Sequence, residues 1–311
     1  MARNKITIAG AGNVGATAAF IAANKNLGDI ILVDILPGFA EGKALDINQA
    51  APVQLYDSQT TGTTEWSKTA DSDVVIITSG MPRKPGMSRD DLLAKNVEIV
   101  KSVTEQALKY SPNAFIILVA NPLDAMVHTA AKVSGIAKNK IMGMAGILDF
   151  ARFSHFIAND LNVSIEDIKG VLMGGHGDDM VPLPRFTTVA GIPLCDLMEQ
   201  NKIDTIIDRT RKGGIEIVNL MGASAYYAPA AGAVKMAEAI LKDTKSVISS
   251  CCYCDKQYGI GGYFVGVPAI LGAKGVEKII ELDLNATEKA MLDESVSHVK
   301  ELSAKVDEFL R

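Results

Sequence analysis

This 311-residue sequence lacks several features, and each absence excludes a class of protein. No apolar run approaches the roughly 20 residues that a membrane-spanning helix needs, so we expect no membrane partner. The net charge is only −5, which favours neither nucleic acid nor an anionic lipid surface as a partner. The first five residues lead directly into a predicted strand and leave no room for a cleaved targeting segment. We therefore expect a cytoplasmic protein.

Cysteine is also scarce, and three of the four cysteines lie together in Cys251-Cys252-Tyr253-Cys254. An extended strand would place Cys252 and Cys254 on one face and Cys251 on the other. No second cysteine pair supplies the remaining ligands of a zinc site, so we expect no metal. We predict free thiols in a buried strand, which fits a reducing compartment.

What the chain does contain is a regular alternation of strand and helix patterns in its first half. The predicted strands cover residues 6–9, 30–33, 74–77 and 115–119, and the predicted helices cover residues 14–24 and 90–110. The first strand is a short β-rich run, and the other three are unbroken apolar runs, as in strands that are buried on both faces. Repeated strand–helix–strand units of this kind predict an α/β fold with a doubly wound, parallel Rossmann sheet.

The pattern changes near Gly143, and a second, α+β catalytic domain is expected after it. Longer helices are predicted over residues 149–161, 205–227, 230–242 and 286–310, with Pro229 separating the middle two. Residues 247–253 and 263–271 resemble antiparallel strands. We therefore predict a nucleotide-binding domain over residues 1–143 and a substrate domain over residues 144–311. Because no flexible linker separates the two, the cleft between them is the expected site.

The first turn of the predicted sheet carries a dinucleotide-binding fingerprint. Gly10-Ala11-Gly12-Asn13-Val14-Gly15 lies between a strand and a helix, where glycines allow the backbone to approach a pyrophosphate. Asp34 ends the second predicted strand, where a carboxylate accepts hydrogen bonds from ribose hydroxyls and repels a 2′-phosphate. The alternative is a tight turn followed by an ordinary capping Asp. Because both features occur in register, we expect NAD as the cofactor.

His176 lies between glycines in Gly174-Gly175-His176-Gly177-Asp178, just after an apolar run. The chain has four histidines, and the other three lie in helix-like patterns. An imidazole can give and take a proton near neutral pH, and glycines around it let a ligand come close. Taken alone, this histidine is better explained as a turn residue that ends a strand, and the other motifs of the chain favour a catalytic role instead.

Five motifs occur in order along the chain, in residues 10–15, 79–91, 121–124, 148–153 and 174–178. Together they resemble the lactate/malate dehydrogenase family along essentially the whole chain. Within that family the sequence is most similar to the malate dehydrogenase branch that is lactate dehydrogenase-like. The resemblance implies hydride transfer between NAD and a small 2-hydroxy acid. It also implies a homo-oligomer, either a dimer or a tetramer.

The resemblance assigns His176 as the acid/base that moves the hydroxyl proton. Asp149 would orient its imidazole and favour the imidazolium, although it could instead cap a helix. Arg152 would hold the substrate C1 carboxylate with two parallel hydrogen bonds, where the alternative is a surface arginine. The 3-residue spacing places Asp149 and Arg152 on one helix face.

The remaining roles that the resemblance implies are less specific. Arg89 would polarise the substrate carbonyl when the 80–86 loop closes as a lid, or would simply be part of a solvated charge run. Asn121 would hydrogen-bond near the nicotinamide and substrate, or would be a turn residue. Ser224 would line the pocket floor. Further cofactor contacts are expected from Ser79, Gly80, Asn96, Val119 and Asn121.

Arg83 selects the substrate in this interpretation. Lactate dehydrogenases typically carry glutamine at the matching loop position, and malate dehydrogenases carry arginine. The second carboxylate of oxaloacetate needs a charged partner in a dry site, because a buried charge without one is costly. We therefore expect malate and oxaloacetate as substrates. Phe150 and Ser154 depart from the family pattern at positions that affect local packing or subunit contacts.

Three rival interpretations remain open. A lactate dehydrogenase is the nearest and differs at Arg83. An NAD-dependent glycosidase shares the nucleotide domain, but such enzymes are longer and bind a metal through Cys and His. A non-enzymatic NAD-binding protein would not need His176, Asp149, Arg152 and Arg89 together.

Overall fold

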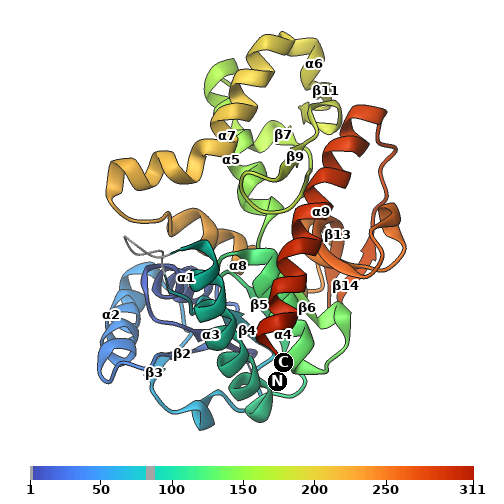
Figure 1. The fold of residues 1–311 in the computed structure, drawn as a ribbon. Coiled ribbons are helices and arrows are strands. Elements are labelled where there is room, and N and C mark those ends of the chain that lie inside the picture. The colour runs from blue at the N-terminus through green and yellow to red at the C-terminus, as the bar shows by residue number, and fades with distance from the viewer. Residues whose placement is uncertain (1–2, 82–87) are drawn as a thin grey trace.

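One large sheet runs through the protein in the computed structural model, which describes residues 3–81 and 88–311 (Figure 1). Its first six strands follow the order β3-β2-β1-β4-β5-β6 and pair in parallel. They are β1 (Lys5–Ala9), β2 (Asp29–Val33), β3 (Thr60–Thr63), β4 (Val74–Ile77), β5 (Phe115–Leu118) and β6 (Ile141–Gly143). This is the strand order of doubly wound dinucleotide-binding sheets, so the predicted fold class is confirmed.

Helices cover both faces of this sheet because successive strand residues point to opposite sides. Val74 and Ile76 of β4 belong to one apolar cluster, and Val75 and Ile77 belong to the other. The first cluster is covered by α1 (Asn13–Asn24), α2 (Phe39–Gln54) and α8 (Tyr227–Leu241), and the second by α3 (Arg89–Tyr110) and α4 (Leu123–Ser134). The long helix α9 (Ala286–Phe309) contributes side chains to both clusters.

The second half of the chain extends the same sheet with antiparallel strands. β12 pairs with β6, β13 with β12, β8 with β13 and β9 with β8, while β14 pairs with the other end of β13. These strands are β8 (Leu172–Gly174), β9 (Met180–Pro182), β12 (Ser246–Cys254), β13 (Tyr263–Gly272) and β14 (Gly275–Ile279). The two halves therefore share one continuous hydrogen-bonded sheet.

A smaller layer completes the second half. A three-stranded antiparallel sheet is formed by β7 (Ile168–Lys169), β10 (Thr188–Val189) and β11 (Ile192–Pro193). The helices α5 (Gly146–Leu161), α6 (Leu194–Leu197) and α7 (Gln200–Met221) belong to this half. Side chains of α5, β7, β10, α6 and α7 form a separate apolar cluster. The mixture of helices and antiparallel strands is the expected α+β arrangement.

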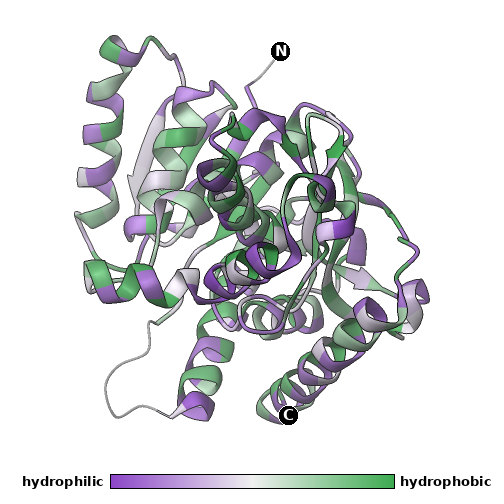
Figure 2. Ribbon diagram, turned by 90° about the horizontal axis from the view of Figure 1, so that it is seen from above, coloured by the Kyte–Doolittle hydropathy of each residue, from purple (hydrophilic) through white to green (hydrophobic). Residues whose placement is uncertain are grey.

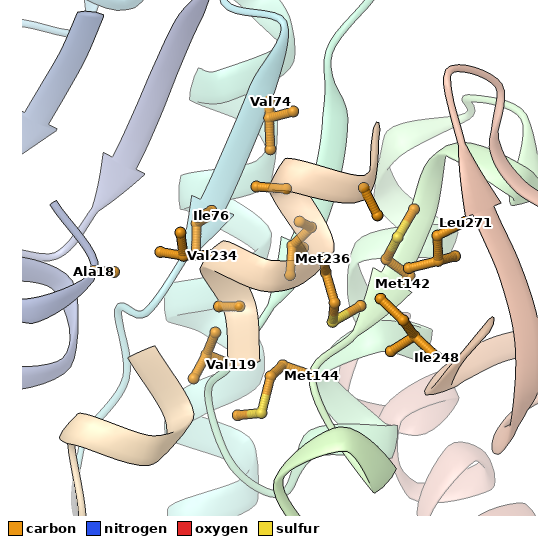
Figure 3. Close-up of a cluster of buried hydrophobic side chains, with 14 of the residues drawn as sticks. Ala18, Val74, Ile76, Val119, Met142, Met144, Val234, Met236, Ile248 and Leu271 are labelled. Carbon is orange, nitrogen blue, oxygen red and sulfur yellow. The ribbon is translucent and has the colours of Figure 1, made fainter. Parts of the chain in front are cut away.

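Helix α8 packs across the junction between the two halves (Figure 3). Its Val234 and Met236 lie in one cluster with Ile76 of β4 and with Ile248 and Leu271 of the antiparallel strands. All five side chains are less than 7% exposed. Burying such side chains contributes about 1.5–3 kcal/mol each relative to exposure. The packing of this one helix therefore holds the two halves in a fixed relation.

The break between α7 and α8 differs from the prediction. The helix expected over residues 205–227 ends at Met221, because Gly222 adopts φ +69° and closes it in the left-handed conformation. Pro229 lies in the first turn of α8 rather than between the two helices. A proline is tolerated there because the first-turn N–H groups have no partner within the helix.

The cysteine-rich segment lies in β12, as predicted. Cys252 and Cys254 pack in one apolar cluster, and Cys251 packs in the other. All three are buried free thiols. Strand alternation thus places the sulfur atoms on both faces of the sheet.

Figure 2 shows that polar and apolar residues alternate along the helices, which matches helices with one buried face. Within residues 3–81 and 88–311, no helix is long and apolar enough to cross a membrane.

Ile240 lies one turn after Met236 on α8. The Ile240→Ala variant should lower the free energy of unfolding by about 2–5 kcal/mol. Ile240 is 3% exposed, so the substitution leaves a cavity at the junction. Ile165, which is 52% exposed, provides the matched control, and Ile165→Ala should change the free energy of unfolding by less than about 0.5 kcal/mol. Urea denaturation of both variants measures the difference. Equal effects would contradict the assigned role of α8.

Candidate active site

The His176 loop follows β8 and reverses direction within a few residues. Gly174 and Gly177 adopt φ values of +83° and +90°, which a residue with a Cβ rarely adopts. A Cβ on Gly174 would also lie 2.7 Å from the carbonyl oxygen of Asp179. The glycines seen in the sequence are therefore required by the turn that presents His176.

Three of the predicted catalytic residues are brought together by this loop and α5. The Nδ1 atom of His176 lies 2.8 Å from Oδ2 of Asp149. Nη1 of Arg152 donates to the other carboxylate oxygen of Asp149 at 3.2 Å. The Asp149 side chain is 1% exposed, so each of its two oxygens has one partner in a buried site. Asp149 lies inside α5, which begins at Gly146, so it is not the helix cap.

This arrangement fixes the protonation chemistry of the imidazole. Burial opposes the charged form, but the Asp149 carboxylate and its hydrogen bond outweigh it, with help from Asp124, and raise the pKa of His176. Because Asp149 accepts from Nδ1, the neutral ring carries its lone pair on Nε2. His176 can therefore accept a proton at Nε2 and return it.

Arg152 retains hydrogen-bonding capacity beyond its bond to Asp149. Its Nε atom is buried and has no partner among the residues that the structure describes. Gly213, in the middle of α7, makes room for the side chain, since a Cβ there would lie 3.1 Å from Cδ of Arg152. A partly buried guanidinium with unused donors is suited to binding a carboxylate.

Two residues that sequence reasoning did not identify hold the backbone of the His176 loop. Oδ2 of Asp124, in the first turn of α4, accepts a hydrogen bond from the backbone N–H of His176 at 3.1 Å. Oγ of Ser295, on α9, accepts from the N–H of Gly175 at 2.8 Å. Asp124 ends the Asn121-Pro122-Leu123-Asp124 motif, which was a signal in the sequence. Ser295 lies in an ordinary helical pattern that gave none.

The glycine fingerprint adopts a geometry that fits a dinucleotide. A Cβ on Gly15 would lie 1.8 Å from the carbonyl oxygen of Gly10, so close packing of α1 against the turn requires glycine there. Gly12 faces open space, and a Cβ there would fill the cradle ahead of α1. Asn13 and Val14 form the first turn of α1, whose N-terminus favours an anionic group. The residues present therefore fit a pyrophosphate.

Asp34 lies beside this cradle, at the end of β2. Its Oδ2 accepts from the backbone N–H of Ala11 at 2.7 Å, and its Oδ1 accepts from that of Leu36 at 3.1 Å. The carboxylate thus ties the glycine turn to the second strand. Further lone pairs on both oxygens remain available to ribose hydroxyls.

The other predicted cofactor contacts converge from β4 and β5. A Cβ on Gly10 would meet Ser79 at 3.1 Å, and one on Gly80 would meet Ala120 at 3.1 Å. Val119 is 9% exposed in the core cluster, and Asn121 is exposed. The ends of β1, β4 and β5 therefore meet around one region.

The Asn96 side chain is hydrogen-bonded within the protein. Its Nδ2 donates to the carbonyl oxygens of Asn121 and Met81, and its Oδ1 accepts from the N–H of Met81. Both amide hydrogens are used within the protein, and the side chain is 1% exposed. Asn96 therefore links two loops of the site, and its place among the cofactor contacts stays a prediction.

Two further predicted residues that the structure describes, Arg89 and Ser224, form no hydrogen bond or ion pair with His176. Arg89 is the exposed first residue of α3, and Ser224 is exposed in the turn between α7 and α8. Arg83 lies outside the described residues. Among the residues that are described, no three His, Cys, Asp or Glu side chains form a group that could hold a metal ion.

Family models match almost the whole chain. The NAD binding domain of lactate/malate dehydrogenases matches residues 4–143, and the alpha/beta C-terminal domain of the same enzymes matches residues 147–310. The chain belongs to the lactate/malate dehydrogenase family. It is 55% identical to a malate dehydrogenase of Cytophaga hutchinsonii over 97% of this chain and 98% of that one. It is also 55% identical to a malate dehydrogenase of Rhodopirellula baltica, over 100% and 99%.

Solved structures of the family are similar throughout. The malate dehydrogenase of Picrophilus torridus matches with a TM-score of 0.97 and 47% identity, over 99% of each chain. A lactate dehydrogenase of Cryptosporidium parvum, solved with lactic acid and nicotinamide adenine dinucleotide, matches with a TM-score of 0.95 and 44% identity, over 99% of each chain. In the present chain, the nucleotide-binding half is thus an NAD-binding domain.

Replacing Asp149 by Asn should lower the pKa of His176 by roughly one to two units, because the variant loses the charge that favours the imidazolium. The imidazolium, which persists to higher pH in the parent, would then be lost at lower pH. Titration of the ring resonances by NMR measures this shift. His298, paired with Asp179 on the surface, is an internal control that should not change. An unchanged pKa of His176 in Asp149→Asn would contradict the pairing of His176 with Asp149.

Proposed function

We propose that this protein is an NAD-dependent malate dehydrogenase that interconverts (S)-malate and oxaloacetate. The observation that carries the proposal is the buried Asp149 carboxylate, bound at once to His176 and to Arg152. Oxidation of a 2-hydroxy acid requires a base for the hydroxyl proton and a cation for the adjacent carboxylate. The malate dehydrogenases at 52–55% identity support the same activity.

The site geometry supports the following catalytic roles. Bound NAD accepts a hydride from the substrate C2 atom, or returns it in the reverse direction. His176 takes the hydroxyl proton at Nε2 during oxidation and delivers it to the carbonyl oxygen during reduction. Asp149 keeps the ring in the tautomer that leaves Nε2 free and favours the imidazolium. Arg152 holds the C1 carboxylate and so sets the position of C2.

Other residues complete the proposed pocket. Arg89 polarises the carbonyl oxygen, Asn121 hydrogen-bonds near the nicotinamide and the substrate, and Ser224 lines the pocket floor. The proposed cofactor contacts are Gly10, Gly12, Asn13, Val14, Gly15, Asp34, Ser79, Gly80, Asn96, Val119 and Asn121. Asp34 excludes a 2′-phosphate by its charge. In this proposal residues 1–143 form the NAD-binding domain, which also supplies Arg83, Arg89 and Asn121 to the substrate, and residues 144–311 form the catalytic domain.

Arg83 decides between malate and lactate in this proposal. A guanidinium pairs with the second carboxylate of oxaloacetate, whereas the methyl group of pyruvate would leave it without a partner. Loss of one partner of a desolvated charge pair costs about 2–5 kcal/mol. This favours malate dehydrogenase over the lactate alternative.

NADH oxidation by the purified protein, with oxaloacetate and pyruvate in parallel, tests the assignment. We expect kcat/KM to favour oxaloacetate by several hundredfold or more. Arg83→Gln should lose most oxaloacetate activity and gain some with pyruvate. Lys84→Gln removes the neighbouring positive charge and is the matched control, which should keep the preference. A parent protein that prefers pyruvate would overturn the substrate assignment. An unchanged substrate preference in Arg83→Gln would overturn the role of Arg83.

We further propose a cytoplasmic homo-oligomer, either a dimer or a tetramer. Buried free thiols favour a reducing compartment. Large apolar side chains are exposed on two helices: Phe39, Leu45 and Val53 on α2, and Ile215, Leu220 and Met221 on α7. Exposed apolar groups of this kind mark faces that another chain covers.

Sedimentation velocity should therefore give a mass of two or four chains. Leu45 is 60% exposed on α2, and Leu45→Glu should shift the mass towards one chain by placing a charge in the interface. Ile165→Glu, at an exposed position after α5, should leave the mass unchanged. A monomeric parent would contradict the proposal.

A further inference from the structure

Asp124 places a second carboxylate beneath the His176 loop, where the proposed reaction does not require one. The side chain is 6% exposed and lies in the first turn of α4. Its Oδ2 accepts the backbone N–H of His176, while its Oδ1 is buried without a hydrogen-bond partner among the described residues. An amide or hydroxyl oxygen would accept the same N–H without the cost of burying a charge. The carboxylate therefore calls for a reason other than the backbone bond.

The surroundings of Asp124 decide whether it carries a charge. Burial raises the pKa of Asp124 above its usual value, and the N–H of His176 and the thiol of Cys251 favour the ionised form and limit that rise. Burial raises the pKa of Cys251 well above its usual range, so the thiol keeps its proton and can donate. The first turn of a helix also stabilises a negative charge. These three groups therefore oppose the effect of burial on the Asp124 carboxyl, and its charge at neutral pH is what the experiment below tests.

Charged and titratable groups approach His176 from every neighbouring element. Asp149 and Arg152 come from α5, Asp124 comes from α4, and Cys251 of β12 lies behind Asp124. On the α9 side the loop meets Ser295, which is uncharged, and His298, which pairs with Asp179. The negative charges nearest the imidazole are therefore Asp149 at its Nδ1 atom and Asp124 below its backbone.

We propose that Asp124 is a positioning residue that anchors the His176 loop and supplies a second negative charge that favours the imidazolium. The inference rests on the proposed function, because it concerns the proton that His176 transfers. In reduction the proton leaves Nε2 for the carbonyl oxygen, and the neutral ring remains. In oxidation the hydroxyl proton goes to Nε2. Asp124 itself exchanges no proton in either direction and acts only through its field and its backbone bond.

Asp124→Asn separates the two parts of this role. The amide oxygen still accepts the His176 N–H, but the charge is gone. Reduction of oxaloacetate needs the imidazolium, so kcat/KM falls as the pH rises through the pKa of His176. We expect that limb to move to lower pH by roughly one unit in Asp124→Asn.

Ser295→Ala is the matched control, since it removes a hydrogen bond from the same loop and no charge. It should lower the rate at every pH and leave the limb in place. A limb that stays at the parent pH in Asp124→Asn, or that moves equally in Ser295→Ala, would overturn the proposal. Either outcome would leave Asp124 with a structural role only.

Two NMR measurements keep the test independent of turnover, and the first, made on the parent, is also independent of variant folding. The carboxyl carbon of Asp124 in the parent should titrate below pH 7. A carboxyl that is still protonated at pH 7 would show that Asp124 carries no negative charge and would refute the proposal. Ring resonances of His176 should give a lower pKa in Asp124→Asn than in the parent. A parent that fails to reduce oxaloacetate would refute the proposed function alone, because these titrations still decide the role of Asp124.

Discussion

The buried carboxylate of Asp149 is the constraint on which the rest of the site depends. A charge that is 1% exposed is tolerated only when its oxygens are paired, and here one meets His176 and the other meets Arg152. Its two partners come from the loop after β8 and from its own helix α5. The carboxylate thus sets the ring orientation and the position of the guanidinium together. A change at any one of the three residues alters the electrostatics of the other two.

The continuous sheet makes this arrangement possible. β6 ends the parallel part and pairs with the antiparallel β12, so the nucleotide-binding half and the catalytic half share backbone hydrogen bonds. α8 packs across both parts, and α9 contacts the His176 loop through Ser295. The cofactor cradle and the acid/base group are therefore held in one rigid framework. A hydride transfer needs such a framework because small displacements of the reacting atoms lower the rate.

The fold alone does not select the substrate. Similar solved structures include malate dehydrogenases and lactate dehydrogenases with TM-scores of 0.95 and above. The shared features are those that handle the proton, the hydride and the common carboxylate. Specificity in our proposal belongs to one side chain, Arg83, which meets the part of the substrate that differs. Function thus depends on the site built on the fold rather than on the fold itself.

Sequence alone determined the parts of this protein that rest on local patterns. The alternation of apolar strands, the glycine turn and the two faces of the cysteine strand were predicted because neighbouring residues define them. The exact end of α7 at Gly222 was missed, since the apolar pattern continues past it. Only the tertiary structure placed Asp124 and Ser295 on the His176 loop and occupied the amide of Asn96. Those contacts join residues far apart in the chain, and no local pattern encodes which distant backbone group a buried side chain will meet.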